Sequence, residues 1–594
     1  MTSEAGAPAT REGTWLGHPR QLFVCFTTEM WERFGFYGMK AILILYLTKH
    51  FLFDDGQAAG IYASYTALVY LTPLIGGLVA DRYLGSRGAV KFGALLMLLG
   101  YYGLAFGGPQ TQQFLEIDSG RYPIEIVDVG NDRTEQYVTI NDQRLRIMPG
   151  TEGSILLKGG AGGAAADQAA PAGDTAAPAQ VAAQDTVLAK GSYALPVERN
   201  QLYLYLMYLS LSLVIIGNGF FKPNISTMVG DLYAPGDGRR ESGFYIFYIG
   251  INMGSVLGQV LLPNMRQTFG FDVAFAVAGV GMTLALLIAI LNDRKLKGYG
   301  EPPNPALLTK NVLAGINVRW MIYILAFAAL VPAWILVQQN ELVGVLLAVF
   351  GFGSFIAMIV YAVLKCGPVE RNRMIVAVVL SMSTIVFWSL FEQSGTTLTL
   401  FADRNTDREI MGWMMPADQV QFFNPLFVVT LAPLFAVFWT YLQRRGLEPS
   451  TPVKFSLGLV QVGLGFLLLV MAMKTADANG QVALIWLVGA YLLYTTGELC
   501  LSPVGLSMIT KLSAPRVVGL MMGVWFLSSA LGQYVVGLIG QRAAVTSVGG
   551  QVNPIEALAV YSQTFTEVGW FAVGFGIFML IVSPLLKRGM HGVN

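Results

Sequence analysis

Four ionisable residues lie within one long apolar stretch near the N-terminus. The stretch spans residues 21–49 and contains Glu29, Glu32, Arg33 and Lys40. Offsets of three, four and eleven residues place these side chains near one face of a helix. Charged groups are costly inside a membrane, so the cluster is a candidate site for moving protons or binding a charged solute.

Three further ionisable residues lie in other apolar stretches. Lys222 belongs to the first half of the chain, whereas Glu392 and Glu498 belong to the second half. Neither of these two carboxylates has a basic residue within a turn or two, so the sequence indicates no partner for them. If the halves face each other, one wall is net positive and the other net negative. A zwitterion with separated charges, such as a free peptide, would fit between them.

Composition indicates a membrane protein. Hydrophobic residues make up 54% of the 594-residue chain and charged residues only 13%, whereas soluble domains carry about 25% charged residues. A soluble enzyme is therefore excluded. Lys and Arg number 38 against 37 Asp and Glu, so the sequence has no basic excess for nucleic acid.

About fourteen apolar segments are long enough to span a bilayer, since each needs roughly 20 residues. They lie at 21–49, 57–80, 88–107, 202–232, 243–265, 271–291, 318–338, 342–365, 373–401, 420–443, 453–474, 482–510, 516–542 and 565–587. The seventh and eighth form a tight hairpin with almost no internal charge. Without this hairpin, six segments precede the gap and six follow it, which is typical of a transporter with two helical bundles.

This pattern predicts an all-α polytopic fold with the following parts. They are an N-terminal tail (1–20), a six-helix bundle (21–291), a linker (292–317), an inserted hairpin (318–365), a second bundle (366–587) and a short tail (588–594). The insertion 108–200 interrupts the first bundle. Its residues 114–157 alternate as short strands, and 159–187 form an Ala/Gly/Pro-rich linker. We find no candidate site in it.

Basic residues gather in alternate loops, for example at Arg82 and Arg87 and at Arg444 and Arg445. By the positive-inside rule both termini are then cytoplasmic, and the insertion lies on the outer face. The first twenty residues have no apolar core, so we expect no cleaved signal peptide.

Enzyme chemistry is not indicated. The three cysteines have no metal-ligand spacing, and the chain shows neither a nucleophile–base pair nor a phosphate loop. We therefore expect no metal, no cofactor and no catalytic residues.

Several runs of residues around the charges resemble known motifs. They are Glu29–Gly38, Gly77–Arg87, Gly217–Pro223, Phe247–Ser255 and the runs through Glu392 and Glu498. Together they resemble the proton-coupled oligopeptide transporters of the major facilitator superfamily. The central hairpin is similar to the extra helix pair of the bacterial members. The resemblance covers nearly the whole chain except 108–200 and the tails.

The resemblance implies a role for each matching residue. Proton coupling falls to Glu29, Glu32, Arg33, Lys222 and Glu392. Peptide binding falls to Lys40 and Lys222 for the carboxylate and Glu498 for the amino terminus, with Tyr37, Tyr70, Asn252, Asn424 and Trp525 lining the pocket. Gly77, Asp81, Arg82, Gly85 and Arg87 match the cytoplasmic loop motif of the superfamily. Phe36 and Lys40 depart from the family pattern, because the family has tyrosine and usually arginine there.

The expected function is proton-coupled import of di- and tripeptides across a bacterial inner membrane by alternating access. The expected partners are a small peptide, the proton as coupling ion and the lipid bilayer, with the chain acting as a monomer. A drug or sugar antiporter, or an importer of nitrate or another anion, on the same scaffold is the alternative.

Overall fold

The structure is a computed structural model of the chain. It describes residues 14–593 except 119, 131–132, 151–152, 160–184, 235, 314 and 549–550. Most of the N-terminal tail and most of the linker predicted at 159–187 therefore lie outside the described residues.

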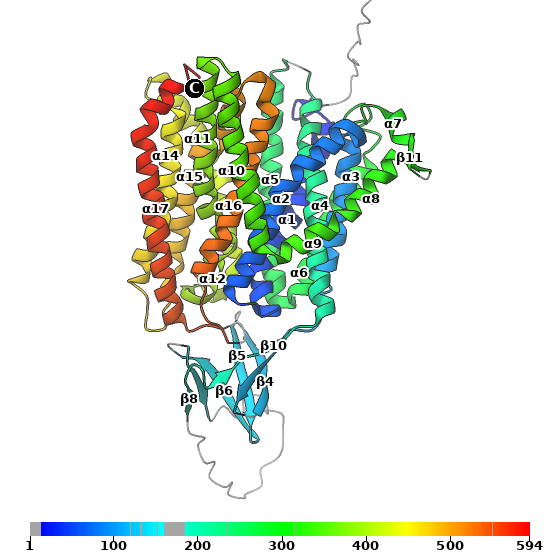
Figure 1. Cartoon of the computed structure of the whole chain (residues 1–594). Coiled ribbons are helices and arrows are strands. Elements are labelled where there is room, and N and C mark those ends of the chain that lie inside the picture. The colour runs from blue at the N-terminus through cyan, green and yellow to red at the C-terminus, as the bar shows by residue number, and fades with distance from the viewer. Residues whose placement is uncertain are drawn as a thin grey trace, which may run out of the picture.

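The first half of the chain supplies one bundle (Figure 1). Its helices are α1 (Gln21–Leu45), α2 (Asp55–Val79), α3 (Gly85–Leu104), α4 (Gln201–Asp231), α5 (Arg239–Phe269) and α6 (Phe271–Leu291). The π-helical turn η1 (Tyr46–His50) extends α1, and η2 (Ala80–Leu84) joins α2 to α3. Helix α1 packs against α5 and α6, and α4 packs against α2 and α3. The predicted charges on α1 and α4 therefore belong to the packed helices of this bundle.

The second bundle begins after a hairpin. The short α7 (Pro305–Thr309) and strands β11 (Asn311–Leu313) and β12 (Ile316–Asn317) lie in the linker before it, and the hairpin itself consists of α8 (Val318–Ala328), α9 (Leu330–Gln338) and α10 (Asn340–Lys365). Helix α9 packs against α2 and α4 of the first bundle, whereas α10 packs against α11 and α16 of the second. The hairpin thus contacts both bundles.

The helices of the second bundle are α11 (Pro368–Phe391), α12 (Thr397–Asn405), α13 (Phe423–Arg444), α14 (Thr451–Met473), α15 (Leu484–Leu512), α16 (Val518–Arg542) and α17 (Pro554–Gly589). Short 3-10 turns lie at η3 (Glu392–Gly395), η4 (Ala417–Phe422) and η5 (Pro515–Val517). Two predicted segments differ in detail from the structure. The segment expected at 373–401 is broken at Glu392 by η3. Helix α17 begins at Pro554 rather than at 565, because Asn553 caps it and proline suits its first turn.

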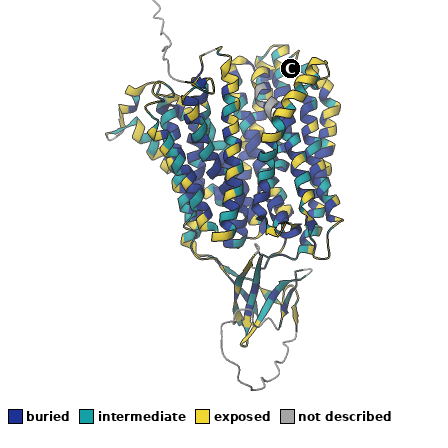
Figure 2. Ribbon diagram, turned by 180° about the vertical axis from the view of Figure 1, so that it is seen from behind, coloured by how far each residue is buried: buried dark blue, intermediate teal, exposed yellow. Residues whose placement is uncertain are grey.

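The fold class predicted from the sequence is confirmed. Twelve helical stretches in the described residues are long and apolar enough to cross a membrane, and one of them, Asp55–Leu104, contains both α2 and α3. Adding α1, which carries four ionisable residues, gives about fourteen. Exposed residues recur along the helices that face outwards (Figure 2). Many exposed residues are large and apolar, such as Leu364 and Val437, each 71% exposed. Such surfaces are stable in lipid but not in water.

The insertion between α3 and α4 forms a small β domain beyond the helix ends (Figure 1). Its strands are β3 (Gln112–Ile117), β4 (Gly120–Gly130), β5 (Arg133–Ile140), β6 (Gln143–Pro149), β7 (Ile155–Lys158), β8 (Thr186–Leu188), β9 (Tyr193–Ala194) and β10 (Val197–Glu198). They pair antiparallel in the order β10-β3-β4-β5-β6-β7-β8, with β9 also paired to β3. We call the helix ends beside this domain the insertion side, and the other ends the opposite side.

Glycines allow α1 and α5 to approach closely. A methyl group placed on Gly254 of α5 would lie 2.1 Å from the backbone oxygen of Met30 in α1, and one on Gly258 would lie 2.2 Å from that of Phe34. Neither oxygen can move without shifting the helix. The spacing of four residues keeps both glycines on one face of α5.

Gly254→Ala is therefore expected to lower the thermal unfolding temperature by several degrees, because overpacking costs about 1–3 kcal/mol. Gly574→Ala on α17 is the matched control, since a methyl group there meets no atom within 4 Å. Unfolding in detergent, followed by tryptophan fluorescence, measures both. Equal unfolding temperatures would contradict the assigned packing of α1 on α5.

Candidate transport site

Two carboxylates share one guanidinium on α1. The Arg33 Nε lies 2.8 Å from the Glu29 Oε1 and 2.5 Å from the Glu32 Oε2. All three side chains are at most 3% exposed. One guanidinium balances one carboxylate, so the cluster on α1 retains a surplus negative charge. A buried charge without compensation costs several kcal/mol, so this surplus must be met by another cation or by a proton.

The remaining polar atoms of the cluster have few partners. Within the described residues, the Glu32 Oε1, the Glu29 Oε2 and the Arg33 Nη2 are buried without a hydrogen bond. The amide of Asn218 on α4 is in the same condition. Satisfied networks are the rule for buried polar groups, so these atoms are candidates for binding a proton or a polar ligand group.

Lys222 is the nearby cation on α4. Its Nζ lies over the ring of Tyr70 on α2, 4.8 Å from the ring centroid. Among the described residues it forms no ion pair within 4 Å. It is nevertheless close enough to act electrostatically on Glu32 and Arg33. Lys222 thus holds a positive charge that balances the surplus on α1 without being bound to it.

Lys40 and Glu392 form an ion pair across the two bundles. The Lys40 Nζ lies 2.5 Å from the Glu392 Oε2, and the two side chains are 7% and 8% exposed. The expectation that Glu392 has no partner was therefore wrong. Its partner is 352 positions away in the chain, so no local pattern could reveal it. In this structure Lys40 is occupied and does not offer the free cation that the sequence suggested.

Glu498 on α15 has a neutral partner instead. Asn424 donates a hydrogen bond from its Nδ2 to the Glu498 Oε2 at 2.9 Å and another to the Thr495 Oγ1 at 3.1 Å. In the described part of the chain no cation pairs with Glu498. The two predicted residues Asn424 and Glu498 are thus brought together by α13 and α15.

The other predicted pocket residues differ in their surroundings. Tyr37 lies between the bundles, within electrostatic reach of Arg33 on one side and of Glu392 and Glu498 on the other. Asn252 donates to the Tyr248 backbone oxygen of its own helix at 3.0 Å. Trp525 is 8% exposed, and its ring packs against Gly505 of α15. The Tyr37 ring centroid lies 5.8 Å from the Arg33 guanidinium carbon, whereas the Asn252 amide and the Trp525 ring make contacts within their own bundles.

The loop motif lies where α2 ends and α3 begins, towards the opposite side. Gly85 follows η2 with φ of +69°, and a methyl group there would collide with the backbone of Glu301 and Pro302. Arg87 pairs with Asp293 and Glu301 at 3.4 Å each. Gly77 packs near Pro223, whereas Asp81 and Arg82 are exposed. The motif therefore joins α3 to the segment after α6.

Comparison with known proteins identifies the family. The model of the POT family, also called PTR2, matches residues 181–555, more than half of the chain. The chain belongs to the POT family. Peptide transporter YePEPT from Yersinia enterocolitica is 31% identical over 558 residues, covering 91% of this chain and 90% of that protein.

Dipeptide and tripeptide permease A from Escherichia coli (strain K12) is 27% identical over 575 residues, covering 96% of this chain and 93% of that protein. A crystal structure of a mutant peptide transporter POT in complex with alafosfalin is also similar. Its TM-score is 0.70 at 30% sequence identity, with 98% of both chains covered. The similarity to these two proteins thus covers at least 96% of this chain.

Ion pairs that the sequence did not predict join the two bundles of this POT chain on the insertion side. Arg404 of α12 forms two hydrogen bonds, 2.6 and 2.7 Å long, with the carboxylate of Asp55, which also accepts from a backbone amide. Lys49 lies 2.6 Å from Asp403. These pairs join residues about 350 positions apart, so only the packing of the bundles brings them together.

A third ion pair and small side chains also join the two bundles on the insertion side. Arg266 of α5 contacts both oxygens of Asp418 in η4, at 2.7 and 3.0 Å. A methyl group on Gly537 of α16 would lie 2.6 Å from Ala63 of α2, whereas one on Gly523, near the other end of α16, would meet only Leu74 at 3.8 Å. The bundles therefore pack tightly against each other on the insertion side.

The Lys40–Glu392 pair is expected to show strong energetic coupling, because removing one member leaves the other charge buried alone, at about 3–5 kcal/mol. Lys40→Met and Glu392→Gln should each lower the unfolding temperature in detergent, and the double variant should recover much of the loss. The exposed pair Arg516–Glu370, 53% and 42% exposed, is the control and should couple weakly. Additive losses at Lys40 and Glu392 would contradict this pairing.

Proposed function

We propose that this chain is a proton-coupled symporter that imports di- and tripeptides across a bacterial inner membrane. One observation carries the proposal. Lys222 in the first bundle and Glu498 in the second are ionisable and, among the described residues, contact neutral partners, Tyr70 and Asn424. A free peptide has a carboxylate that can pair with Lys222 and an ammonium that can pair with Glu498. One ligand therefore gives both residues a partner of opposite charge.

Charge balance supports coupling to protons. Glu29, Glu32, Arg33 and Lys222 sum to zero when all are ionised. If Lys222 binds the peptide carboxylate, the surplus negative charge on α1 loses its balancing cation. A proton on Glu32 or Glu29 removes that surplus, so peptide and proton are most stable when bound together. This is the thermodynamic requirement for symport, because each ligand raises the affinity for the other.

The ion pairs of the insertion side support alternating access. In this structure Lys40–Glu392, Lys49–Asp403 and Arg404–Asp55 hold the bundles together there. A protonated Glu392 cannot hold Lys40 as an ion pair. Proton binding at this carboxyl therefore favours separation of the bundles on the insertion side, and proton loss favours the closed state seen here.

The same proposal sets the orientation and the partners. With both termini in the cytoplasm, the insertion side faces the periplasm, and an inward proton gradient drives the peptide from that side. The chain works as a monomer in the bilayer, without cofactor or metal, and performs transport rather than catalysis. The relatives named peptide transporter and dipeptide and tripeptide permease support the substrate class.

Uptake into liposomes tests the function. With an acidic exterior and a clamped membrane potential, labelled dialanine should accumulate, and a protonophore should abolish accumulation. Glu32→Gln and Lys222→Ala should each lose most gradient-driven uptake, because the first cannot exchange the proton and the second cannot hold the carboxylate.

Matched controls are available on the surface. Glu341→Gln and Lys310→Ala make the same chemical changes at exposed positions of the hairpin region and should transport normally. Full gradient-driven uptake in both site variants would rule out the mechanism. Stronger competition by nitrate, a sugar or a dye than by unlabelled dialanine would favour another substrate class.

A further inference from the structure

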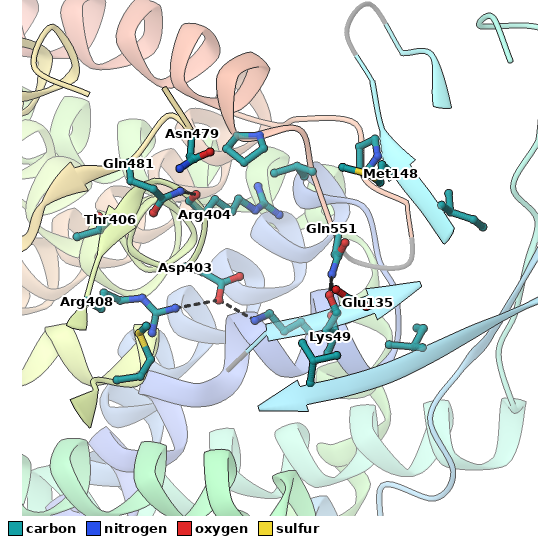
Figure 3. Close-up of a pocket in the computed structure, with 18 of the residues that line it drawn as sticks. Lys49, Glu135, Met148, Asp403, Arg404, Thr406, Arg408, Asn479, Gln481 and Gln551 are labelled. Atoms are coloured by element: carbon teal, nitrogen blue, oxygen red, sulfur yellow. Dashed lines mark hydrogen bonds and ion pairs between the residues drawn. The ribbon is translucent and has the colours of Figure 1, made fainter. Parts of the chain in front are cut away.

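A cavity of about 800 Å³ lies outside the bundles, between the β domain and the helix ends of the insertion side (Figure 3). Strands β5 and β6 form one wall, and the end of α12 with the segment that follows it forms another. Residues of the α14–α15 and α16–α17 loops complete it, among them Asn479 and Gln551. None of the residues predicted from the sequence lines this cavity.

Its walls carry charges of both signs. Lys49 and Arg408 approach Asp403 at 2.6 and 4.0 Å, as the dashed lines in Figure 3 show. On the β domain, Arg146 lies 2.7 Å from Glu135. A dipeptide in this space can exchange its own carboxylate and ammonium with the members of such pairs, so the cavity suits a zwitterion better than a neutral or singly charged solute.

The cavity adjoins the ion pairs that close the insertion side. Asp403 and Arg404 line it, and they are also the residues that bind Lys49 and Asp55 of the first bundle. A solute bound in this cavity can therefore reach groups that belong to the closing contacts. Competition for Lys49 or Asp403 by a bound peptide also weakens a contact that holds the bundles together.

The outer wall is fastened to both bundles. On the side of the first bundle, Arg199 directly follows β10. It donates hydrogen bonds of 2.7 and 2.8 Å to the backbone oxygens of Phe51 and Leu52, which directly follow η1. At the other end, Val548 of the α16–α17 loop is 2% exposed and belongs to the hydrophobic core of the β domain. Its backbone oxygen accepts a hydrogen bond from Gln136.

We propose that this cavity is a second binding site for short zwitterionic peptides, with the β domain as its outer wall and Val548 as the contact that keeps that wall in place. The inference rests on the proposed function, because it assumes the same substrate class. The site collects peptide at the insertion side before the bundles separate.

The β-domain wall can be tested without touching the central charges. Glu135→Gln with Arg146→Gln removes one pair that lines the cavity. Glu125→Gln with Arg144→Gln is the matched control, because this pair of the same sheet, 2.9 Å apart, does not line it. The cavity variant should raise KM for dialanine uptake roughly fivefold at unchanged kcat, as expected for loss of binding of about 1 kcal/mol. The control should keep the wild-type KM.

A second variant changes only the contact that holds the β domain against the second bundle. Val548→Asp places a charge in the core of the β domain and should detach the wall, raising KM by a similar factor. Val187→Asp makes the same change at a position of β8 that is 66% exposed and should have no effect. Absence of dialanine uptake by the wild type would defeat the proposed function itself. Normal uptake by the wild type, with KM in both cavity variants equal to their controls, would overturn only the second site.

Discussion

A buried charge needs a partner, and in this protein several deep charges have theirs on the other bundle. Lys40 pairs with Glu392 and Asp55 pairs with Arg404, in each case across the two bundles. These contacts are strong because water is excluded from them, yet each depends on the ionisation of a carboxylate. The same interactions therefore close one side of the molecule and make its closure sensitive to protons and to competing charged ligands.

The contacts of Arg33 explain the surplus negative charge on α1. One guanidinium lies between Glu29 and Glu32 on the same helix, so α1 cannot neutralise itself. The balance comes from Lys222, which stacks on an aromatic ring and stays available to a ligand. An arrangement of this kind is costly for stability alone, since apolar residues of similar volume are often at least as stable. Its value lies in exchange of partners, which a transporter needs.

The β domain, which lies beyond the helix ends, also contacts both bundles. Its own apolar core is small and is completed by Val548 from the second bundle. Arg199, next to β10, is hydrogen-bonded to the first bundle. The β domain therefore contacts both of the bundles that must separate during transport. It also walls the cavity in which charges of both signs remain reachable. An insertion in which the sequence shows no candidate site is thus joined to the closed side of the transporter.

The sequence by itself determined the helical membrane fold, the division into two bundles with a hairpin, and the positions of the deep charges. These follow from run length, composition and local spacing, which depend on neighbours in the chain. It could not determine which charges meet. Glu392 lacks a nearby cation in the sequence but has Lys40 in space, whereas Lys222 and Glu498 are left with neutral partners. Such pairings, and the burial of Val548 in a distant domain, join residues hundreds of positions apart, so only the packing of helices decides them.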